Sequence, residues 1–246
     1  MSSNTFQDAT REQTSILAPL ERAVLRGLAR RLPARVNSDH LSLLGLLAMF
    51  FAGVFYAASG RNPLLLHLVN LCIFLNWFGD SLDGTLARYR NHCRPRYGFY
   101  VDHVIDTFGT MFLIFGLALS GYMTERVAAA TLIVFLMLAI NSYLAAYTLG
   151  VFKISHGKLG PTEIRLVIIV GNLFLLNSAH TRLFGNRFLL FDVGGVVAMV
   201  IMGTMLIFSS LKNTHSLYNL ERLPKAEVRG QMSEVGSQTN PLTSDL

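Results

Sequence analysis

The sequence predicts an all-α, polytopic membrane protein with six transmembrane helices and an N-terminal amphipathic helix at the membrane interface. Hydrophobic residues make up 52% of the 246 residues and charged residues only 15%, with a mean hydropathy of +0.43, which excludes an ordinary soluble domain. Apolar runs of about twenty residues recur, and this is the length that crosses a bilayer as a helix. Two well-separated cysteines provide no disulfide framework.

The segment before the first apolar run predicts an amphipathic helix over 15–32, ended by Pro33. Such a helix is typical of the membrane interface, and it is equally typical of a helix packed on protein. Both can hold at once. The polar first fourteen residues and the lack of a small-residue cleavage site predict no cleavable signal peptide. The helix has two faces: Ile16, Leu20, Val24 and Leu28 against Arg22, Arg26 and Arg30.

Six apolar runs follow, and each predicts a transmembrane helix. A cap at Asn37, Ser38 or Asp39 begins the first of them. The fifth run is short for a full crossing. The predicted spans are 41–58, 64–88, 98–119, 127–147, 164–176 and 188–211, with turns at 60–63 and 180–187 and a basic loop at 89–97.

These spans divide the chain into three regions. Residues 1–35 hold the polar segment and the amphipathic helix, residues 36–212 form a six-helix catalytic domain, and residues 213–246 form a cytoplasmic tail. The tail is polar and poor in aromatic residues, a composition that predicts disorder.

Loop charges predict the orientation of the helices. Sixteen of the 21 Lys and Arg residues lie before the first span, at the end of the second span or in the loop after it, in the fourth–fifth loop, or after the sixth span. Four lie on the other side. Because Lys and Arg preferentially stay in the cytoplasm, both termini are predicted to be cytoplasmic. The net charge of +6 therefore reflects the Lys and Arg residues of the cytoplasmic loops, and we expect no nucleic-acid partner.

Four aspartates at the ends of two apolar segments are the strongest functional signal. Asp80 and Asp83 are three residues apart, and Asp102 and Asp106 are four apart, so each pair shares a helix face. Two such helices, packed antiparallel, would bring all four carboxylates around one centre. Charged oxygens near hydrocarbon are costly unless they are paired or bind a cation. The set therefore predicts a site for one or two divalent ions, Mg²⁺, Mn²⁺ or Ca²⁺ rather than zinc.

The residues around these aspartates resemble the signature of the CDP-alcohol phosphotransferase family, D-x2-D-G-x2-A-R-x8-G-x3-D-x3-D. Nine residues, rather than the usual eight, separate Arg88 from Gly98. An extra residue in a connecting loop leaves the aspartates on their helices. The motif covers 27 residues, and the six-span layout extends the likeness over most of the chain. Its fixed positions are Asp80, Asp83, Gly84, Ala87, Arg88, Gly98, Asp102 and Asp106.

The resemblance implies an enzyme in which an alcohol attacks the β-phosphorus of a CDP-linked donor, releasing CMP. It implies two Mg²⁺ or Mn²⁺ ions and metal ligands among Asp80, Asp83 and Asp102. Asp106 would be a further ligand or the general base, which makes Asp102 and Asp106 the catalytic pair. A homodimer is also implied. The nucleotide would contact the two aspartates of the first pair together with Gly84, Ala87, Arg88 and Gly98.

A second polar set, less specific than the first, surrounds the start of the fifth span. Arg165 is predicted to bind a phosphate or a polar head group, or else to pair with Glu163. Lys153 and Lys158 would steer an anionic acceptor, or would simply be cytoplasmic loop charges.

Several hypotheses about the function fit these residues. CDP-diacylglycerol is the favoured donor, with a polar alcohol as acceptor. The alternative is CDP-choline or CDP-ethanolamine donating to diacylglycerol. A polyprenyl transferase also has aspartate pairs but separates them further along its chain. A cation transporter is the non-enzymatic alternative, although transporters usually place their acids near the bilayer midplane.

Overall fold

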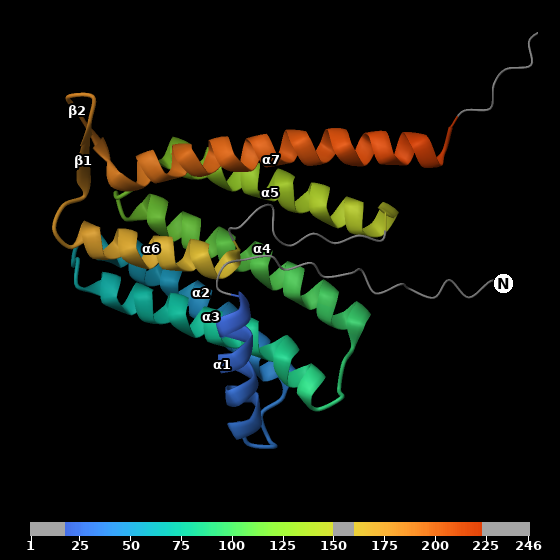
Figure 1. Ribbon diagram of the computed structural model, residues 1–246. Helices are drawn as coiled ribbons and strands as arrows, with labels where there is room; N and C mark the ends of the chain where they lie inside the picture. Colours follow the sequence, from blue (N-terminus) through green and yellow to red (C-terminus); the bar gives the residue numbers. More distant parts are fainter. Residues whose placement is uncertain (1–17, 150–159, 223–246) are drawn as a thin grey trace, which may run out of the picture.

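The computed structural model describes residues 18–149 and 160–222, which are mostly helical (Figure 1). The elements run in the order α1 (Ala18–Arg31), α2 (Ser38–Ser59), α3 (Leu65–Tyr89), α4 (Pro95–Leu119), α5 (Glu125–Leu149), α6 (Pro161–Leu175), β1 (His180–Leu183), β2 (Asn186–Leu189) and α7 (Leu190–Leu220).

Five of these helices are long and apolar enough to cross a membrane, namely α2, α3, α4, α5 and α7. Helix α6 lies at the predicted fifth span but has only 15 residues. At 1.5 Å per residue it is about 22 Å long, which is less than the ~30 Å hydrocarbon core of a bilayer.

Helix α1 lies inside the range predicted for the amphipathic helix, and it runs across the long helices rather than along them (Figure 1). It ends before Pro33, as expected. Leu25 and Ala29 on its inner face are buried against Leu82 and Leu86 of α3. Helix α1 is therefore packed on protein along that face.

Asn37 is the cap that begins α2. Its side-chain oxygen accepts a hydrogen bond from the His40 backbone N–H (3.0 Å), and the His40 ring accepts one from the Asn37 N–H (3.3 Å). This reciprocal arrangement satisfies two backbone donors at the helix start. It decides among the three caps that the sequence left open.

Helix α2 is the element that joins the two acidic helices. It packs along both α3 and α4, while α5 packs on α4 and α7, and α6 packs on α3. The sequence predicted direct packing of α3 on α4, but within the described residues that contact is slight. The acidic pairs therefore face each other across a space that is backed by α2.

Glycines permit the close approach of α2 to its neighbours. A Cβ added to Gly79 of α3 would lie 2.5 Å from the Leu41 carbonyl oxygen and 2.9 Å from the Gly45 nitrogen. Gly53 and Gly116 place the backbones of α2 and α4 in direct contact. Small residues at helix crossings are a common means of packing in membranes.

Several helix boundaries differ from the predicted ones. Helix α4 begins at Pro95 rather than near Gly98, because a proline fits the first turn of a helix, where its missing N–H costs nothing. The connection from α3 is correspondingly shorter than the predicted loop 89–97. Helix α7 continues to Leu220, so the predicted tail boundary at 212 comes too early.

Residues 180–187, predicted as a simple turn, belong to a β-hairpin. Strands β1 and β2 pair antiparallel from His180 with Leu189 to Leu183 with Asn186. Phe184 and Gly185 form the connection, with φ values of 48° and 81°. Two successive positive φ angles are typical of the tightest hairpin turns. Strands of four residues are too short to give a recognisable alternation in the sequence.

Candidate active site

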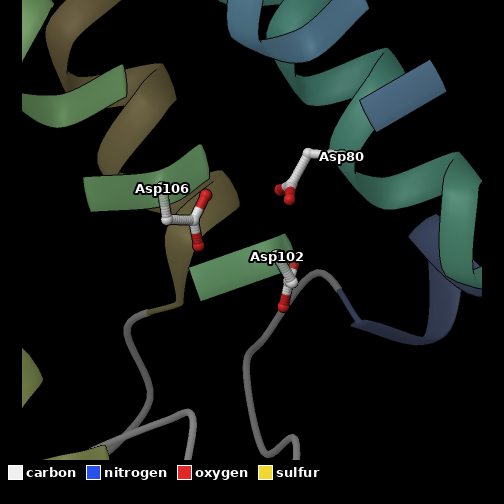
Figure 2. Close-up of side chains that lie close together, drawn as sticks. All are labelled: Asp80, Asp102 and Asp106. Atoms are coloured by element: carbon white, nitrogen blue, oxygen red, sulfur yellow. The ribbon is translucent and has the colours of Figure 1, made fainter. Parts of the chain in front are cut away.

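Three of the four predicted aspartates meet between α3 and α4. Asp80, Asp102 and Asp106 each offer a carboxylate oxygen within 4.8 Å of the others. Figure 2 shows Asp80, from α3, facing Asp106 across a common space, with Asp102 beside them on α4. Asp80 and Asp102 are partly buried, and Asp106 is more exposed. The cluster is thus open to a ligand on its Asp106 side.

Asp83 is not part of this closest group, but it lines the same small cavity. The cavity has a volume of about 10 Å³, and its walls include Asp80, Asp83 and Asp102. Ser42 Oγ of α2 donates a hydrogen bond of 2.6 Å to Asp83 Oδ2, and the Gly84 N–H donates one of 2.5 Å to Oδ1. Helix α2 therefore fixes the orientation of this fourth carboxylate.

Arg165 of α6 supplies positive charge to the cluster. Its Nη2 donates to Asp80 Oδ2 at 2.6 Å, and its Nε donates to Asn76 Oδ1 at 3.0 Å. Asn76 in turn donates to the Gly45 carbonyl oxygen at 3.1 Å. The sequence predicted two alternative roles for Arg165, binding an anion or pairing with Glu163. The structure places its guanidinium on a carboxylate of the acidic cluster.

The remaining motif residues lie one to two turns further along α3 and at the start of α4. Arg88 is exposed and donates to Thr85 Oγ1 at 3.4 Å. A Cβ on Gly84 would lie 3.4 Å from Arg88 Nη1. Gly98 is exposed, and a Cβ there would have no neighbour within 4 Å among the described residues. Open space therefore borders the acidic cluster on this side.

A larger cavity of about 340 Å³ lies beside Ala87, at the α3–α4 connection. Arg94 pairs with Asp39 at its rim. The Arg90 guanidinium donates to backbone carbonyl groups between α1 and α2, among them those of Pro33 and Val36. The two arginines hold the cavity walls together. The lining residues are Asn37, Ser38, Asp39, Leu86, Ala87, Arg90, His92, Cys93 and Arg94.

Of the other residues predicted to bind the acceptor, only Glu163 lies among the described residues. Glu163 accepts a hydrogen bond from the Gly160 N–H at 2.9 Å and so caps the start of α6. Lys153 and Lys158 lie outside the described residues. His103, beside the cluster, hydrogen bonds through Nδ1 to the Phe99 carbonyl oxygen at 2.7 Å. The same nitrogen of His103 lies 3.7 Å from Asp102 Oδ2.

The donor set fits a divalent cation. Three carboxylates converge on one point, and a fourth lines a cavity with room for about one water-sized group. Oxygen donors with no sulfur or imidazole in the described cluster suit Mg²⁺ or Mn²⁺. Arg165 offsets part of the negative charge, and a bound cation would offset more.

Comparison with known proteins agrees with this geometry. The sequence profile of the family described as CDP-alcohol phosphatidyltransferase matches residues 37–211, which include α2 through most of α7. The chain belongs to this family. A search of the curated proteins found no match to the chain.

Membership establishes the general activity. The family transfers a phosphate-containing group from a CDP-alcohol in phospholipid synthesis, and it generally uses divalent metal ions. Together with the five long apolar helices, it identifies the chain as an integral membrane protein. The acidic cluster lies on two of those helices.

Sequence reasoning missed two residues that the structure places around the site. Ser42 comes from α2, and no spacing pattern links a single serine to Asp83. Glu21 of α1 accepts a hydrogen bond from Ser81 Oγ, and Ser81 is the residue after Asp80. In the sequence, Glu21 is distinguished by being an acidic residue in a helix otherwise rich in arginine.

Proposed function

We propose that the protein transfers a phosphatidyl group from CDP-diacylglycerol to the hydroxyl of a small polar alcohol, with release of CMP. A new bond forms between the hydroxyl oxygen and the β-phosphorus of the donor, and the bond from that phosphorus to the CMP oxygen breaks. The observation that supports this most is the convergence of Asp80, Asp102 and Asp106 within 4.8 Å, with Asp83 on the adjoining cavity.

In this proposal the aspartates divide the work. Asp80, Asp83 and Asp102 hold two Mg²⁺ or Mn²⁺ ions, and Asp106 is a further ligand or takes the proton of the attacking hydroxyl. Asp106 is the most exposed of the three clustered acids, which suits contact with an incoming alcohol. Divalent ions bound there would offset charge on the diphosphate oxygens and on the departing CMP.

The nucleotide would occupy the open space beside Gly84, Ala87, Arg88 and Gly98. Two features support this. Gly98 leaves room on α4, and the cavity of about 340 Å³ adjoins Ala87. Over Gly84, the nearest atoms belong to the flexible side chain of Arg88. Arg88 would offer its guanidinium to phosphate oxygens.

The acceptor would bind near Arg165, whose position beside Asp80 suits a polar or phosphorylated head group. Glu163 would contribute by ordering the first turn of α6. Lys153 and Lys158 would add positive charge to attract an anionic acceptor.

We further propose six spans, with α6 as the fifth, and both termini in the cytoplasm. The loop charges support this orientation. The active site would then face the cytoplasm, and α1 would lie in the membrane interface beside it. A catalytic domain from residue 36 to the end of α7 at Leu220, a cytoplasmic C-terminal tail after it, and a homodimer complete the proposal.

The test uses the purified full-length chain in lipid nanodiscs with Mg²⁺ or Mn²⁺. Radiolabelled CDP-diacylglycerol is offered with a panel of alcohols, including inositol, serine and glycerol phosphate, and CMP and labelled lipid are measured. CMP release that depends on one acceptor supports the proposal. Release only from CDP-choline or CDP-ethanolamine with diacylglycerol would reverse the donor assignment. No release from any pair would overturn the proposal.

A further inference from the structure

A buried glutamate joins three helices next to the acidic cluster. Glu21 of α1 has only 9% of its surface exposed. Its Oε1 accepts hydrogen bonds from Trp77 Nε1 at 2.8 Å and Ser81 Oγ at 3.0 Å, both on α3. The same oxygen accepts one from Thr162 Oγ1 of α6, also at 3.0 Å. We call these four residues the Glu21 clasp.

The second carboxylate oxygen of Glu21 has a different environment. Oε2 is buried, and it has no hydrogen-bond partner among the described residues. A buried acceptor left unsatisfied costs about 1–3 kcal/mol, and more when it is charged. Stability alone therefore does not account for an acid at this position, and each such group calls for an explanation.

The clasp lies at the same level of the bundle as the contact between α6 and the acidic cluster. Ser81 directly follows Asp80 on α3, and Thr162 is one helical turn before Arg165 on α6. The clasp therefore fixes α6 against α3 beside the place where Arg165 reaches Asp80 at 2.6 Å.

We infer that Glu21 is a positioning residue for the reaction proposed above, on which this inference rests. It holds α6 so that the Arg165 guanidinium stays on Asp80, and it thereby sets the charge balance of the acidic cluster. Glu21 does not contact the cluster itself. It acts through Ser81 and Thr162, on the two helices that carry Asp80 and Arg165.

Loss of the clasp has a distinctive consequence. When Arg165 moves away from Asp80, the cluster keeps all its carboxylates and loses a nearby positive charge. Cations then bind the cluster more tightly, whereas an anionic diphosphate binds less tightly. A general loosening of the fold would weaken both, so the two opposite changes separate positioning from a purely structural role.

The experiment measures Mn²⁺ binding by electron paramagnetic resonance and the KM for CDP-diacylglycerol, both on the full-length protein in nanodiscs. For Glu21→Ala we expect tighter Mn²⁺ binding and a KM raised about tenfold, the value of one charge-assisted hydrogen bond of ~1.5 kcal/mol. Glu21→Gln keeps a side-chain oxygen for the three donors, so it should restore most of both values. Glu125→Ala, which removes an exposed acid from the first turn of α5, is the matched control and should change neither.

Two further variants keep the test decisive. Thr162→Val preserves side-chain shape and removes one hydrogen bond, so it should shift both values in the same directions but less. If Glu21→Ala fails to fold, an unchanged Mn²⁺ affinity in folded Thr162→Val would overturn the inference.

In an Arg165→Ala background, Glu21→Ala should have no further effect. Weaker binding of both Mn²⁺ and the donor in Glu21→Ala would also overturn the inference. So would an undiminished effect of Glu21→Ala on the two values in the Arg165→Ala background. The Mn²⁺ measurement needs no turnover, so a wild-type chain inactive with every donor would count against the proposed function alone.

Discussion

The two ends of the helix bundle contain different kinds of polar group: neutral side chains that pair with one another at one end, and converging carboxylates at the other. Far along the bundle from the aspartates, Tyr56 donates to Asn172 Oδ1 at 2.5 Å, and Asn172 Nδ2 donates to Asn70 Oδ1 at 2.7 Å. Tyr56 and Asn172 are both fully buried. At the acidic end, three carboxylates converge within 4.8 Å, and the side chains of Asp80 and Asp102 remain about one quarter exposed.

The difference shows what each end is for. Neutral groups that satisfy one another stabilise a membrane fold, because each donor finds an acceptor away from water. Like charges that gather near hydrocarbon repel one another and lose hydration, so a fold keeps them only where a ligand offsets the cost. We therefore propose that the amide end serves stability, and that the acidic end serves binding and catalysis at some expense of stability.

Replacing a carboxylate of the acidic cluster should have the largest effect, because it should lower activity without lowering stability. We expect Asp102→Asn to lower the CMP release rate about a thousandfold, because several kcal/mol of charge stabilisation are lost. The apparent Tm should not fall, since the substitution also removes a repelling charge. Asp83→Asn should behave in the same way. Turnover of radiolabelled donor and thermal unfolding in nanodiscs measure the two effects.

The matched control for Asp102→Asn is Asp192→Asn. Asp192 Oδ1 accepts a hydrogen bond from the Thr124 N–H at 2.7 Å, far from the cluster, and an asparagine oxygen can accept the same bond. Its rate should stay at the wild-type value. Near-normal turnover in Asp102→Asn would remove the role proposed for that residue.

Gly79 tests whether the acidic end depends on the close crossing of α2 and α3. An added Cβ would meet the backbone of Leu41 and Gly45, which cannot move as a flexible side chain can. We expect Gly79→Ala to cost about 1–3 kcal/mol, the usual range for overpacking, and to lower activity by separating Ser42 from Asp83. Gly194→Ala on α7, where the part of the chain that the structure describes has no atom within 4 Å of the added Cβ, is the control. Equal Tm and activity in both variants would contradict this account of the crossing.

Tyr56 tests the amide end by itself. Tyr56→Phe removes one hydroxyl and leaves Asn172 Oδ1 without that donor, at a cost of about 1–2 kcal/mol. The Tm should fall, while the rate per folded molecule should stay unchanged because the acidic end is intact. Tyr147→Phe, at a position 90% exposed, should alter neither value. A change in KM for Tyr56→Phe would show that the two ends are coupled.

The sequence predicted most of the long helices and the acidic cluster because both depend on local patterns. Apolar runs set the helices, and an i, i+3 or i, i+4 spacing puts acids on one face whatever the neighbours are. This is why each pair of aspartates was expected on one helix face. All four were expected around one centre, whereas only Asp80, Asp102 and Asp106 form the closest group.

What the sequence could not give depends on long-range packing. Nothing local says that α2 joins α3 to α4, that Ser42 orients Asp83, or that Glu21 meets Thr162 across 141 positions. The role of Arg165 was left with two alternatives for the same reason, since its partner Asp80 is 85 positions away.

Gly98 gives the finest test, because stability and binding should respond in opposite directions. It lies within α4, and a Cβ there would have open space around it. Alanine at an exposed helical position should stabilise the fold by about 0.5–1 kcal/mol relative to glycine. If the nucleotide approaches α4 at this point, the same methyl group must raise the KM for the donor.

We therefore expect Gly98→Ala to keep or raise the Tm while raising the KM for CDP-diacylglycerol about fivefold, equivalent to ~1 kcal/mol of lost binding. Gly203→Ala on α7, which also has open space around the added Cβ, should keep the KM of the wild type. An unchanged KM in Gly98→Ala would move the nucleotide away from α4 and toward the cavity beside Ala87. The proposed metal site would be unaffected, because Gly98 contributes no carboxylate to the acidic cluster.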